Sequence, residues 1–454
     1  MGVPRVDAVV AGAGVAGLAA ALELQDAGCE VAVVDPSDRP GGVMRTDHVS
    51  GYVIERGPNT VQVGPTMLGF LRRRGLEEVV LRARPASRLR YIFRGGALVQ
   101  VPMSPVALAR TPLLRARGKL RLLLEPFVRR GPPEGESVAE FVGRRLGRDV
   151  VSGLVGPFLT GVYAGDEDQL GARAVFKKLV ELEQRYGSIA GGALLGAFGA
   201  RGPRGLRGSY STEQGLGVFA RSLADRLAEP PGLGSRVARI ARDGARWRVE
   251  VSAPSGERSL DAARLVLATP AFAAAELLRG VDADAASALE EIVYAPIVGI
   301  AVGVDPADAA TPIEGFGFLT ARDEGLALLG CLFMSRLFPS RAPQGRELLQ
   351  CMLAGMRHPD LIDEPDDALA KRVAADLERT LGLRGEVAPL AITRWPRAVP
   401  QPGRDHVGRI GWVRERLRDL PGLVLAGSYV DGVGVSDALA SGVVAAQELV
   451  ARDA

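Results

Sequence analysis

A glycine-rich turn between a strand and a helix constrains the fold of this chain more than any other feature. The apolar run 6–11 leads directly into Gly12-Ala13-Gly14-Val15-Ala16-Gly17, and a helical pattern and a second apolar run, 30–34, follow. A lone GxGxxG spacing is a weak signal, but here the strand and the helix that it requires are both present. The sequence therefore predicts a βαβ unit that binds a dinucleotide.

Each residue type in this unit suits a separate part of a dinucleotide. Gly12 permits the tight turn, Gly14 lets a diphosphate approach the backbone, and Gly17 allows the helix to pack closely on the strand. The N-terminus of the helix presents free N–H groups to the phosphates. Asp35 ends the second strand, where its carboxylate can bind both hydroxyls of an adenosine ribose.

Length and composition exclude several classes of protein. At about 150 residues per domain, 454 residues predict two or three domains. Hydrophobic residues at 47% and charged residues at 24% are typical of a globular protein and exclude disordered, collagen-like and disulfide-scaffold chains. A net charge of +3 argues against a nucleic-acid partner, and we interpret the excess of arginine over lysine mainly as a coding bias.

The few cysteines and histidines predict no metal site. Three cysteines and three histidines lie scattered along the chain without the spacing of metal ligands. A strand pattern follows the N-terminus almost at once, so we expect no signal peptide, and no uncharged stretch is long enough for a membrane-spanning helix. We therefore expect a cytoplasmic protein, with thiols in a reduced state.

The residues after the nucleotide motif distinguish a flavin from a nicotinamide. The segment 35–46, with Asp35, Arg39 and Gly41-Gly42 at fixed spacing, resembles the amine-oxidase and phytoene-desaturase superfamily of FAD enzymes. The segments 55–60 and 427–436 resemble the stretches of that superfamily that pass the flavin ring and its pyrimidine end. The resemblance implies FAD as the cofactor, bound by the following residues: Gly12, Gly14, Gly17, Asp35, Arg39, Gly41, Gly42, Gly57, Asn59, Val237, Trp395, Gly427, Val433 and Val435.

Three segments in the middle and the last third of the chain narrow the resemblance to one family. Residues 158–166 contain GVYAGD, residues 329–343 are similar to LGTLFSS…FPxRAP, and residues 394–401 begin with Arg-Trp-Pro. Together they resemble the protoporphyrinogen oxidases, in the family order from about residue 5 to residue 450. The chain departs from the family at Gln401-Pro402 and at Gln214, which affects the placement of the substrate more than the flavin chemistry.

The resemblance implies a reaction and a substrate site. FAD would take a hydride from a methylene bridge of a porphyrinogen, and O2 would reoxidise the flavin with release of H2O2. The backbone carbonyl of Gly161 would hold pyrrole N–H groups, and Arg90 would pair with a propionate. Leu319, Leu332 and Met352 match residues that sandwich the rings, although each would otherwise be interpreted as ordinary core.

Other functions remain open at this point. Coproporphyrinogen III is an alternative substrate, with two additional propionates that would need more basic groups at the mouth of the pocket. An amine oxidase or a carotenoid desaturase is a more distant alternative on the same fold. A binding or escort protein that lacks the flavin is disfavoured by the intact glycines at positions 12, 14, 41 and 42.

The predicted fold class is α/β, with a discontinuous Rossmann-type FAD-binding domain, an α+β substrate domain with a mixed sheet, and a helical membrane-associated insertion. The predicted domains are 1–85, 205–290 and 405–454 for FAD, 86–204 for the helical part, and 291–404 for the substrate. Within the helical part, the segment 110–130 carries seven basic residues and one acid among leucines. It is interpreted either as a helix packed on the protein or as a peripheral membrane surface. A homodimer is a further possibility.

Overall fold

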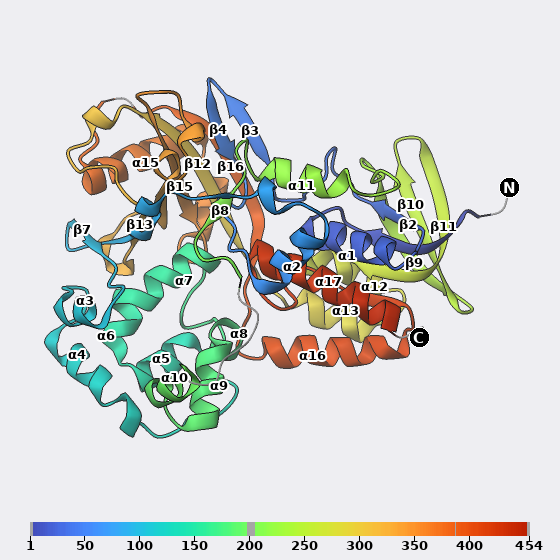
Figure 1. Ribbon diagram of the computed structural model, residues 1–454, viewed down its shortest axis with the longest axis horizontal. Helices are drawn as coiled ribbons and strands as arrows, with labels where there is room; N and C mark the ends of the chain where they lie inside the picture. The colour runs from blue at the N-terminus through green and yellow to red at the C-terminus, as the bar shows by residue number, and fades with distance from the viewer. Residues whose placement is uncertain (1–2, 198–204, 386, 452–454) are drawn as a thin grey trace.

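The structure is a computed structural model that describes residues 3–197, 205–385 and 387–451. Figure 1 shows a sheet with flanking helices at the right, a second sheet at the upper left and a group of helices at the lower left. We call these parts the nucleotide region, the sheet region and the helical region. Their combination confirms the predicted mixed α/β fold. The predicted domain boundary at 204 lies outside the described residues.

The nucleotide region is built on a six-stranded sheet whose strands come from distant parts of the chain. Its strand order is β2-β1-β11-β10-β9, and β17 pairs with β11 beyond the end of β10. Strand β1 is parallel to β2 and β11, whereas β9, β10 and β11 are antiparallel. The strands are β1 (Arg5–Ala11), β2 (Val31–Val34), β9 (Arg236–Asp243), β10 (Arg246–Ala253), β11 (Gly256–Leu267) and β17 (Leu423–Leu425). The predicted βαβ unit is thereby confirmed, and β9 and β10 form a hairpin around residue 244.

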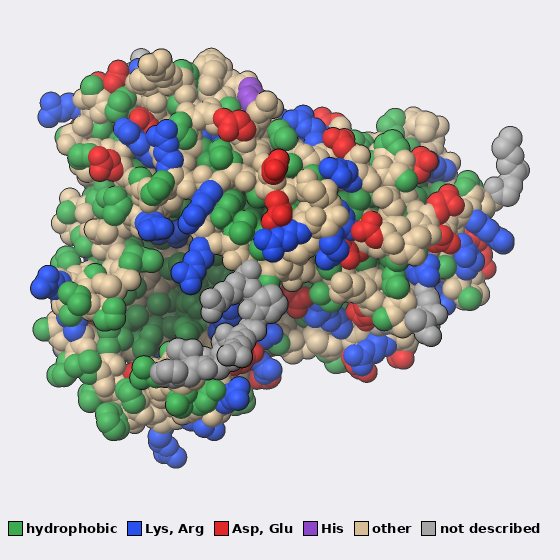
Figure 2. Space-filling model, viewed as in Figure 1, with side chains coloured by type: hydrophobic (Ala, Val, Ile, Leu, Met, Phe, Trp, Pro, Cys, Tyr) green, Lys and Arg blue, Asp and Glu red, His purple; other side chains and the backbone are tan. Residues whose placement is uncertain are grey.

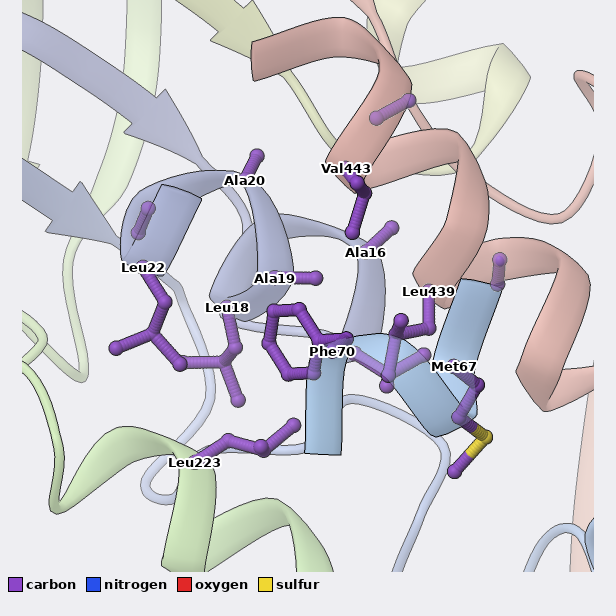
Figure 3. Packing of buried hydrophobic residues seen from close by; sticks show 14 of the residues in the cluster. Ala16, Leu18, Ala19, Ala20, Leu22, Met67, Phe70, Leu223, Leu439 and Val443 are labelled. Atoms are coloured by element: carbon purple, nitrogen blue, oxygen red, sulfur yellow. The ribbon is translucent and has the colours of Figure 1, made fainter. Parts of the chain in front are cut away.

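The core on one side of this sheet depends on small residues. Helix α1 (Val15–Asp26) is buried on nearly all sides between the sheet and α2 (Pro65–Arg73), α11 (Leu216–Ala224) and α17 (Val435–Ala451). Figure 3 shows Ala16 and Ala19 of α1 in this packing, with Phe70 of α2 and Val443 of α17. A Cβ on Gly442 would lie 2.0 Å from the Ala16 carbonyl oxygen, so α1 and α17 are in backbone contact. Alanine and glycine at these positions allow that approach.

Helices α12, α13 and α16 cover the other side of the nucleotide sheet. They are short and amphipathic, and their apolar faces pack on β9, β10 and β11. Two small sheets, β3–β4 and β5–β8, complete this part of the chain. These elements are α12 (Ala271–Leu278), α13 (Ala283–Glu290), α16 (His406–Arg416), β3 (Thr46–Val49), β4 (Tyr52–Glu55), β5 (Leu81–Arg82) and β8 (Tyr210–Ser211).

The sheet region contains seven strands in the order β16-β12-β15-β14-β13-β6-β7. All pairs are antiparallel except β6 with β13, so the sheet is mixed as predicted. Residues 91–100, which the sequence groups with the helical part, form β6 and β7 here. Helix α15 (Asp366–Leu381) packs on the sheet. The strands are β6 (Tyr91–Arg94), β7 (Ala97–Gln100), β12 (Tyr294–Val304), β13 (Gly317–Thr320), β14 (Gly330–Phe333), β15 (Glu347–Ala354) and β16 (Pro389–Pro400).

The helical region has charged side chains inside it. Arg145, Glu125 and Glu183 are almost completely buried, and Arg145 forms an ion pair with each of the two carboxylates. The helices are α3 (Pro105–Arg110), α4 (Ala116–Leu123), α5 (Val138–Arg145), α6 (Arg148–Val150), α7 (Gly156–Tyr163), α8 (Ala172–Val175), α9 (Lys177–Tyr186) and α10 (Ile189–Ala197). Over the described ranges, no helix is both long and apolar enough to cross a membrane.

A buried ion pair connects the nucleotide region with the sheet region. Arg341, which follows α14 (Met334–Leu337), donates to Glu55 at the end of β4 over 2.9 Å, and both side chains are buried. Glu55 also accepts from the backbone N–H of Leu216 at the start of α11. Burial raises the pKa of Glu55, and the charge of Arg341 opposes that effect. The two family-like segments 55–60 and 329–343 thus meet in space.

Candidate functional site

The glycine-rich turn has the geometry that a dinucleotide needs. A Cβ on Gly12, at a φ of +108°, would lie 2.6 Å from the Ala268 carbonyl oxygen, and one on Gly17 would lie 1.9 Å from the Gly12 carbonyl oxygen. A Cβ on Gly14 would instead meet open space. Gly12 and Gly17 are therefore required by packing, whereas Gly14 keeps a free face at the N-terminus of α1. No side chain caps that terminus and its first turn holds no acid, so its N–H groups are available to an anion.

Asp35 lies beside this turn. Its carboxylate is buried and accepts hydrogen bonds from the backbone N–H of Ala13 at 2.6 Å and of Ser37 at 2.8 Å. The N–H of Ser235 donates to the Asp35 carbonyl oxygen, which brings the start of β9 and its residue Val237 close to the same point. Two bonds from backbone groups fix the carboxylate at the end of β2, where the ribose is predicted to lie.

The double glycine packs against the nucleotide turn. The N–H of Gly41 donates to the Ala13 carbonyl oxygen at 2.8 Å, and a Cβ on Gly42 would lie 3.4 Å from the Cα of Gly14. Both glycines have positive φ angles, which favour glycine. Arg39 is half-buried nearby and forms no ion pair with any described residue. Within the part of the chain that the structure describes, it is a cation without an anionic partner next to a predicted diphosphate site.

A third group of predicted cofactor residues meets between the regions. The indole N–H of Trp395 on β16 donates to the Arg56 carbonyl oxygen at 2.6 Å, which places Trp395 beside Gly57 and Asn59. The Oδ1 atom of Asn59 is buried without a hydrogen-bond partner among the described residues. A buried acceptor without a donor is unfavourable unless a ligand supplies one.

The C-terminal loop completes the predicted cofactor site. The N–H of Gly427 donates to the Ser441 hydroxyl at 2.8 Å, and Asp437 accepts from the N–H of Gly434 at the start of α17. Val433 and Val435 lie at this helix start. The open face of Gly14, the unpaired Arg39 and the unpartnered Asn59 therefore fit a bound dinucleotide with a flavin ring between the nucleotide region and the sheet region.

The three predicted ring-contacting residues lie on one face of the seven-stranded sheet. Leu319 pairs with Gly330, which pairs with Met352, and Leu332 is two residues from Gly330 on the same strand. Directly paired residues, and residues two apart on a strand, point to the same side of a sheet. All three side chains are half-exposed, whereas Cys331 and Cys351 on the opposite face are completely buried.

Gly161 faces Leu319 from the last turn of α7. A Cβ on Gly161 would lie 2.4 Å from the Cδ2 atom of Leu319, so the helix and the strand are in direct contact there. No described residue donates a hydrogen bond to the Gly161 carbonyl oxygen, as is common in the last turn of a helix. This carbonyl is therefore an available acceptor beside the apolar face of the sheet.

Arg90 directly precedes β6, the strand that pairs with β13 in the same sheet. Its guanidinium stacks over the Phe316 ring at 4.3 Å from the centroid, and it forms no ion pair with any described residue. The side chain is exposed, and partial desolvation by neighbouring atoms lowers its pKa without removing its charge. A stacked, fixed cation of this kind is suited to binding a carboxylate.

Figure 2 shows a hollow in the part of the surface where Figure 1 places α7. Hydrophobic side chains line it, and Lys and Arg side chains lie along its upper edge. A second cavity of about 600 Å³ lies between α9, α16 and the loop 428–433, and it borders Tyr163 and Val433. Apolar space with cations at its rim can hold a flat apolar molecule that carries acidic groups.

Two further side chains shape this site, although neither was predicted to be a site residue. Gln401 donates from its amide to the Tyr163 carbonyl oxygen at 2.8 Å, which holds the end of α7 against β16. Arg357 donates to the Thr160 hydroxyl at 3.1 Å, one residue before Gly161. Their hydrogen-bond partners lie about 200 residues away along the chain, so no local pattern predicts these contacts. The only signal in the sequence is that each residue follows a strand that resembles the family.

Comparisons with known proteins agree with this geometry. Residues 15–450 match the family model described as flavin containing amine oxidoreductase. The chain is 31% identical to the chloroplastic protoporphyrinogen oxidase of Nicotiana tabacum over 95% of this chain and 83% of that protein. It is 27% identical to the coproporphyrinogen III oxidase of Bacillus subtilis (strain 168) over 97% of each chain. A crystal structure from Exiguobacterium sp. 255-15, provisionally named a protoporphyrinogen oxidase, superposes over the whole of both chains with a TM-score of 0.81 and 26% identity.

Proposed function

The chain belongs to the flavin containing amine oxidoreductases, and we propose that it is an FAD-dependent oxidase of protoporphyrinogen IX. The observation that carries the proposal is the arrangement of three features on the seven-stranded sheet and at the end of α7. An apolar face formed by Leu319, Leu332 and Met352 lies opposite the free carbonyl of Gly161, and Arg90 provides a cation on the same sheet. A porphyrinogen has apolar bridges, pyrrole N–H donors and propionates, which match these three features.

The glycine-rich turn, Arg39 and Asn59 would hold FAD, and the bound cofactor would supply two-electron redox chemistry, in which a hydride would leave a methylene bridge of the substrate and O2 would be reduced to H2O2. The chain itself orients the macrocycle. The Gly161 carbonyl accepts hydrogen bonds from pyrrole N–H groups, and Arg90 pairs with a propionate. The apolar face of the sheet excludes water from the reacting bridge. A side-chain base is not required, because pyrrole N–H protons can leave by tautomerisation. Three such rounds convert the porphyrinogen into the aromatic porphyrin.

Two variants separate the roles of Arg90. We expect Arg90→Ala to lower kcat/KM about 10–100-fold, because a hydrogen-bonded ion pair with the substrate is lost, while the flavin absorbance remains. Arg90→Lys keeps the charge but not the two-pronged geometry, so it should fall between Arg90→Ala and the wild type. Steady-state kinetics of Arg90→Ala that equal those of the wild type would remove Arg90 from the proposed site.

Coproporphyrinogen III is the second candidate substrate, and the full-length similarity to the Bacillus subtilis enzyme favours keeping it. Anaerobic mixing with each porphyrinogen and comparison of the flavin bleaching rates distinguishes the two. Faster bleaching by protoporphyrinogen is the expected result. Faster bleaching by coproporphyrinogen would replace the proposed substrate, and the absence of bleaching by either would overturn the proposed function.

We also propose that the helical region binds an anionic membrane surface peripherally, at the inner face of the cell membrane. Leu123 and Phe127 are 73% and 85% exposed, and Leu194 on the adjacent α10 is 69% exposed. The basic residues of segment 110–130 surround the first two. Apolar side chains among cations are typical of interfacial segments. In flotation with anionic vesicles at low salt, the wild type should bind and Leu123→Ser/Phe127→Ser should not. Failure of the wild type to bind would overturn this proposal.

A further inference from the structure

Arg357 lies at the junction between α7 and β13, the two elements that carry Gly161 and Leu319. Its Nη2 atom donates to the Thr160 hydroxyl at 3.1 Å, and its Nη1 atom lies 3.5 Å from both oxygens of Thr320. Thr160 directly precedes Gly161, and Thr320 directly follows Leu319. One side chain therefore bridges the neighbours of the two residues that face each other across the proposed substrate site.

The contact that Arg357 supports has little tolerance for movement. Leu319 occupies the space that a side chain at position 161 would need, because a Cβ on Gly161 would lie 2.4 Å from the Leu319 Cδ2 atom. Closely packed elements respond to displacements of less than 1 Å. A shift of α7 along β13 would move the Gly161 carbonyl relative to the apolar face on which the substrate rests.

Strained backbone holds Arg357 in this place. Ala354 and Ala164 are two of the three residues other than glycine with positive φ among the described residues, at +73° and +48°. The N–H of Met356 donates to the Ala164 carbonyl oxygen at 2.7 Å, and a Cβ on Gly355 would also lie 2.7 Å from that oxygen. The turn after β15 thus joins the end of α7 directly. Such strain persists only where the surrounding structure requires it, and it is concentrated at functional sites.

The electrostatic environment of Arg357 distinguishes it from an ordinary ion-pair arginine. No described carboxylate lies within 4 Å of its guanidinium. The nearby carboxylates of Asp166 and Glu167 pair with Arg322 instead, at 2.9 Å and 3.7 Å. Burial lowers the pKa of Arg357, although an arginine stays charged at neutral pH. Its donors are thus used for two hydroxyls and a carbonyl, next to the negative C-terminal end of α7.

We infer that Arg357 is a positioning residue that fixes the separation of Gly161 and Leu319 and thereby the orientation of the substrate. The inference rests on the proposed function. It predicts that loss of the bridge slows turnover more than it weakens binding, because the substrate still enters the site but rests at a wrong angle to the flavin. A misplacement of about 1 Å can lower a rate by about 100-fold.

The test is a double-mutant cycle between Arg357 and Thr160, with porphyrinogen kinetics, flavin absorbance and Tm measured for each protein. We expect Arg357→Met to lower kcat about 10–100-fold with a change in KM of less than about threefold and with FAD retained. Thr160→Val should also lower kcat, because it removes the hydroxyl that accepts from Arg357. The double variant should be no slower than Arg357→Met alone, because both changes remove one interaction.

Conservative variants separate a positioning role from a purely structural one. Thr160→Ser keeps the hydroxyl and should restore kcat to the wild-type value, and Arg357→Lys should recover part of it. Arg372→Met, which removes an exposed pair with Glu364, is the matched control and should change neither kcat nor KM. If Arg357→Met does not fold, Thr160→Val and Thr160→Ser alone still test the bridge.

The outcomes also separate this inference from the proposed function. Additive losses in the double variant, or a kcat of folded Arg357→Met within about threefold of the wild type, would overturn the inference while the wild type still oxidises a porphyrinogen. A wild-type protein that binds FAD but oxidises neither porphyrinogen would overturn the proposed function instead.

Discussion

The nucleotide region and the helical region achieve close packing by opposite means. Around α1, small residues allow backbones to touch, and a single methyl group on Gly17 or Gly442 would collide with a carbonyl oxygen. In the helical region, Arg145 forms buried ion pairs with Glu125 and Glu183 beside a core of larger hydrophobic side chains. The first region should therefore be sensitive to added atoms and the second to removed charges.

The buried carboxylate of Glu125 also serves as a helix cap. It accepts hydrogen bonds from the Ser188 hydroxyl at 2.8 Å and from the N–H groups of Ile189 at 2.9 Å and Ala190 at 3.1 Å, at the start of α10. Arg145 in turn donates to Glu125 and to the carbonyl oxygens of Val128 and Gly187. Arg145 and Glu125 therefore each have several hydrogen-bond partners, and removal of either side chain leaves buried polar groups without one.

The largest expected effect is that of Arg145→Met. Glu125 would remain buried without its cation, whereas Glu183 would keep its ion pair with Arg144 at 2.7 Å. Breaking a buried pair in this way costs about 3–5 kcal/mol in the free energy of unfolding. Urea unfolding followed by far-UV circular dichroism measures it. A loss below about 1 kcal/mol would show that the network contributes little and that the two regions do not differ as described.

Gly17→Ala should cost about 1–3 kcal/mol and weaken FAD binding, since the new Cβ would lie 1.9 Å from the Gly12 carbonyl oxygen and the turn must open. Gly408→Ala is the matched control, because Gly408 also lies in the first turn of a helix but its Cβ would meet no atom within 4 Å. That variant should stabilise α16 by about 0.5–1 kcal/mol. Equal Tm values for the two variants would contradict this account of the nucleotide region.

Acid should loosen the helical region through Glu125. Burial raises the pKa of Glu125, but the hydrogen bonds from Ile189, Ser188 and Ala190 and the charge of Arg145 outweigh that effect, so the pKa lies below its ordinary value. A carboxyl whose pKa is lowered by folding stabilises the protein at neutral pH, and this contribution is lost as the pH falls through the lowered pKa. The protection factors of the Ile189 and Ala190 amides, which compare the observed exchange with the intrinsic rate at each pH, should therefore fall below about pH 4. Protection factors that stay constant down to pH 3 would argue against the cap.

The smallest effect is expected at an exposed pair. Lys371 and Asp367 lie one turn apart on α15 at 3.5 Å, and both side chains are about four-fifths exposed. Lys371→Met should change the free energy of unfolding by less than about 0.5 kcal/mol. A loss comparable to that of Arg145→Met would show that burial is not what separates the two cases.

The sequence was most informative where neighbouring residues determine the structure. The βαβ unit could be predicted because hydrophobic period and turn residues are local signals, whereas residues 91–100 were assigned to the helical part and form β6 and β7. The placement of β6 next to β13 could not, because that parallel pair joins residues more than 200 positions apart. A short strand carries no signal of its distant partner.

The site divides in the same way. Gly12, Gly14 and Gly17 could be predicted from their spacing between a strand pattern and a helix pattern. The register of β13, β14 and β15 explains why Leu319, Leu332 and Met352 lie on one face. The roles of these three residues and of Gly161 stay predictions. Arg357 and the pair of Arg341 with Glu55 were beyond reach, because a buried polar contact depends on side-chain geometry in three dimensions.

The order of strands in the nucleotide sheet has a consequence for synthesis. Its glycine-rich turn leaves the ribosome early, but β11 follows more than 200 residues later, and β17 and α17 come within the last 35 residues. During translation one edge of the first βαβ unit and one face of α1 therefore stay uncovered until β11 and α17 have been synthesised. Cofactor capture should therefore follow chain release, and a truncation before residue 423 should yield a protein without flavin.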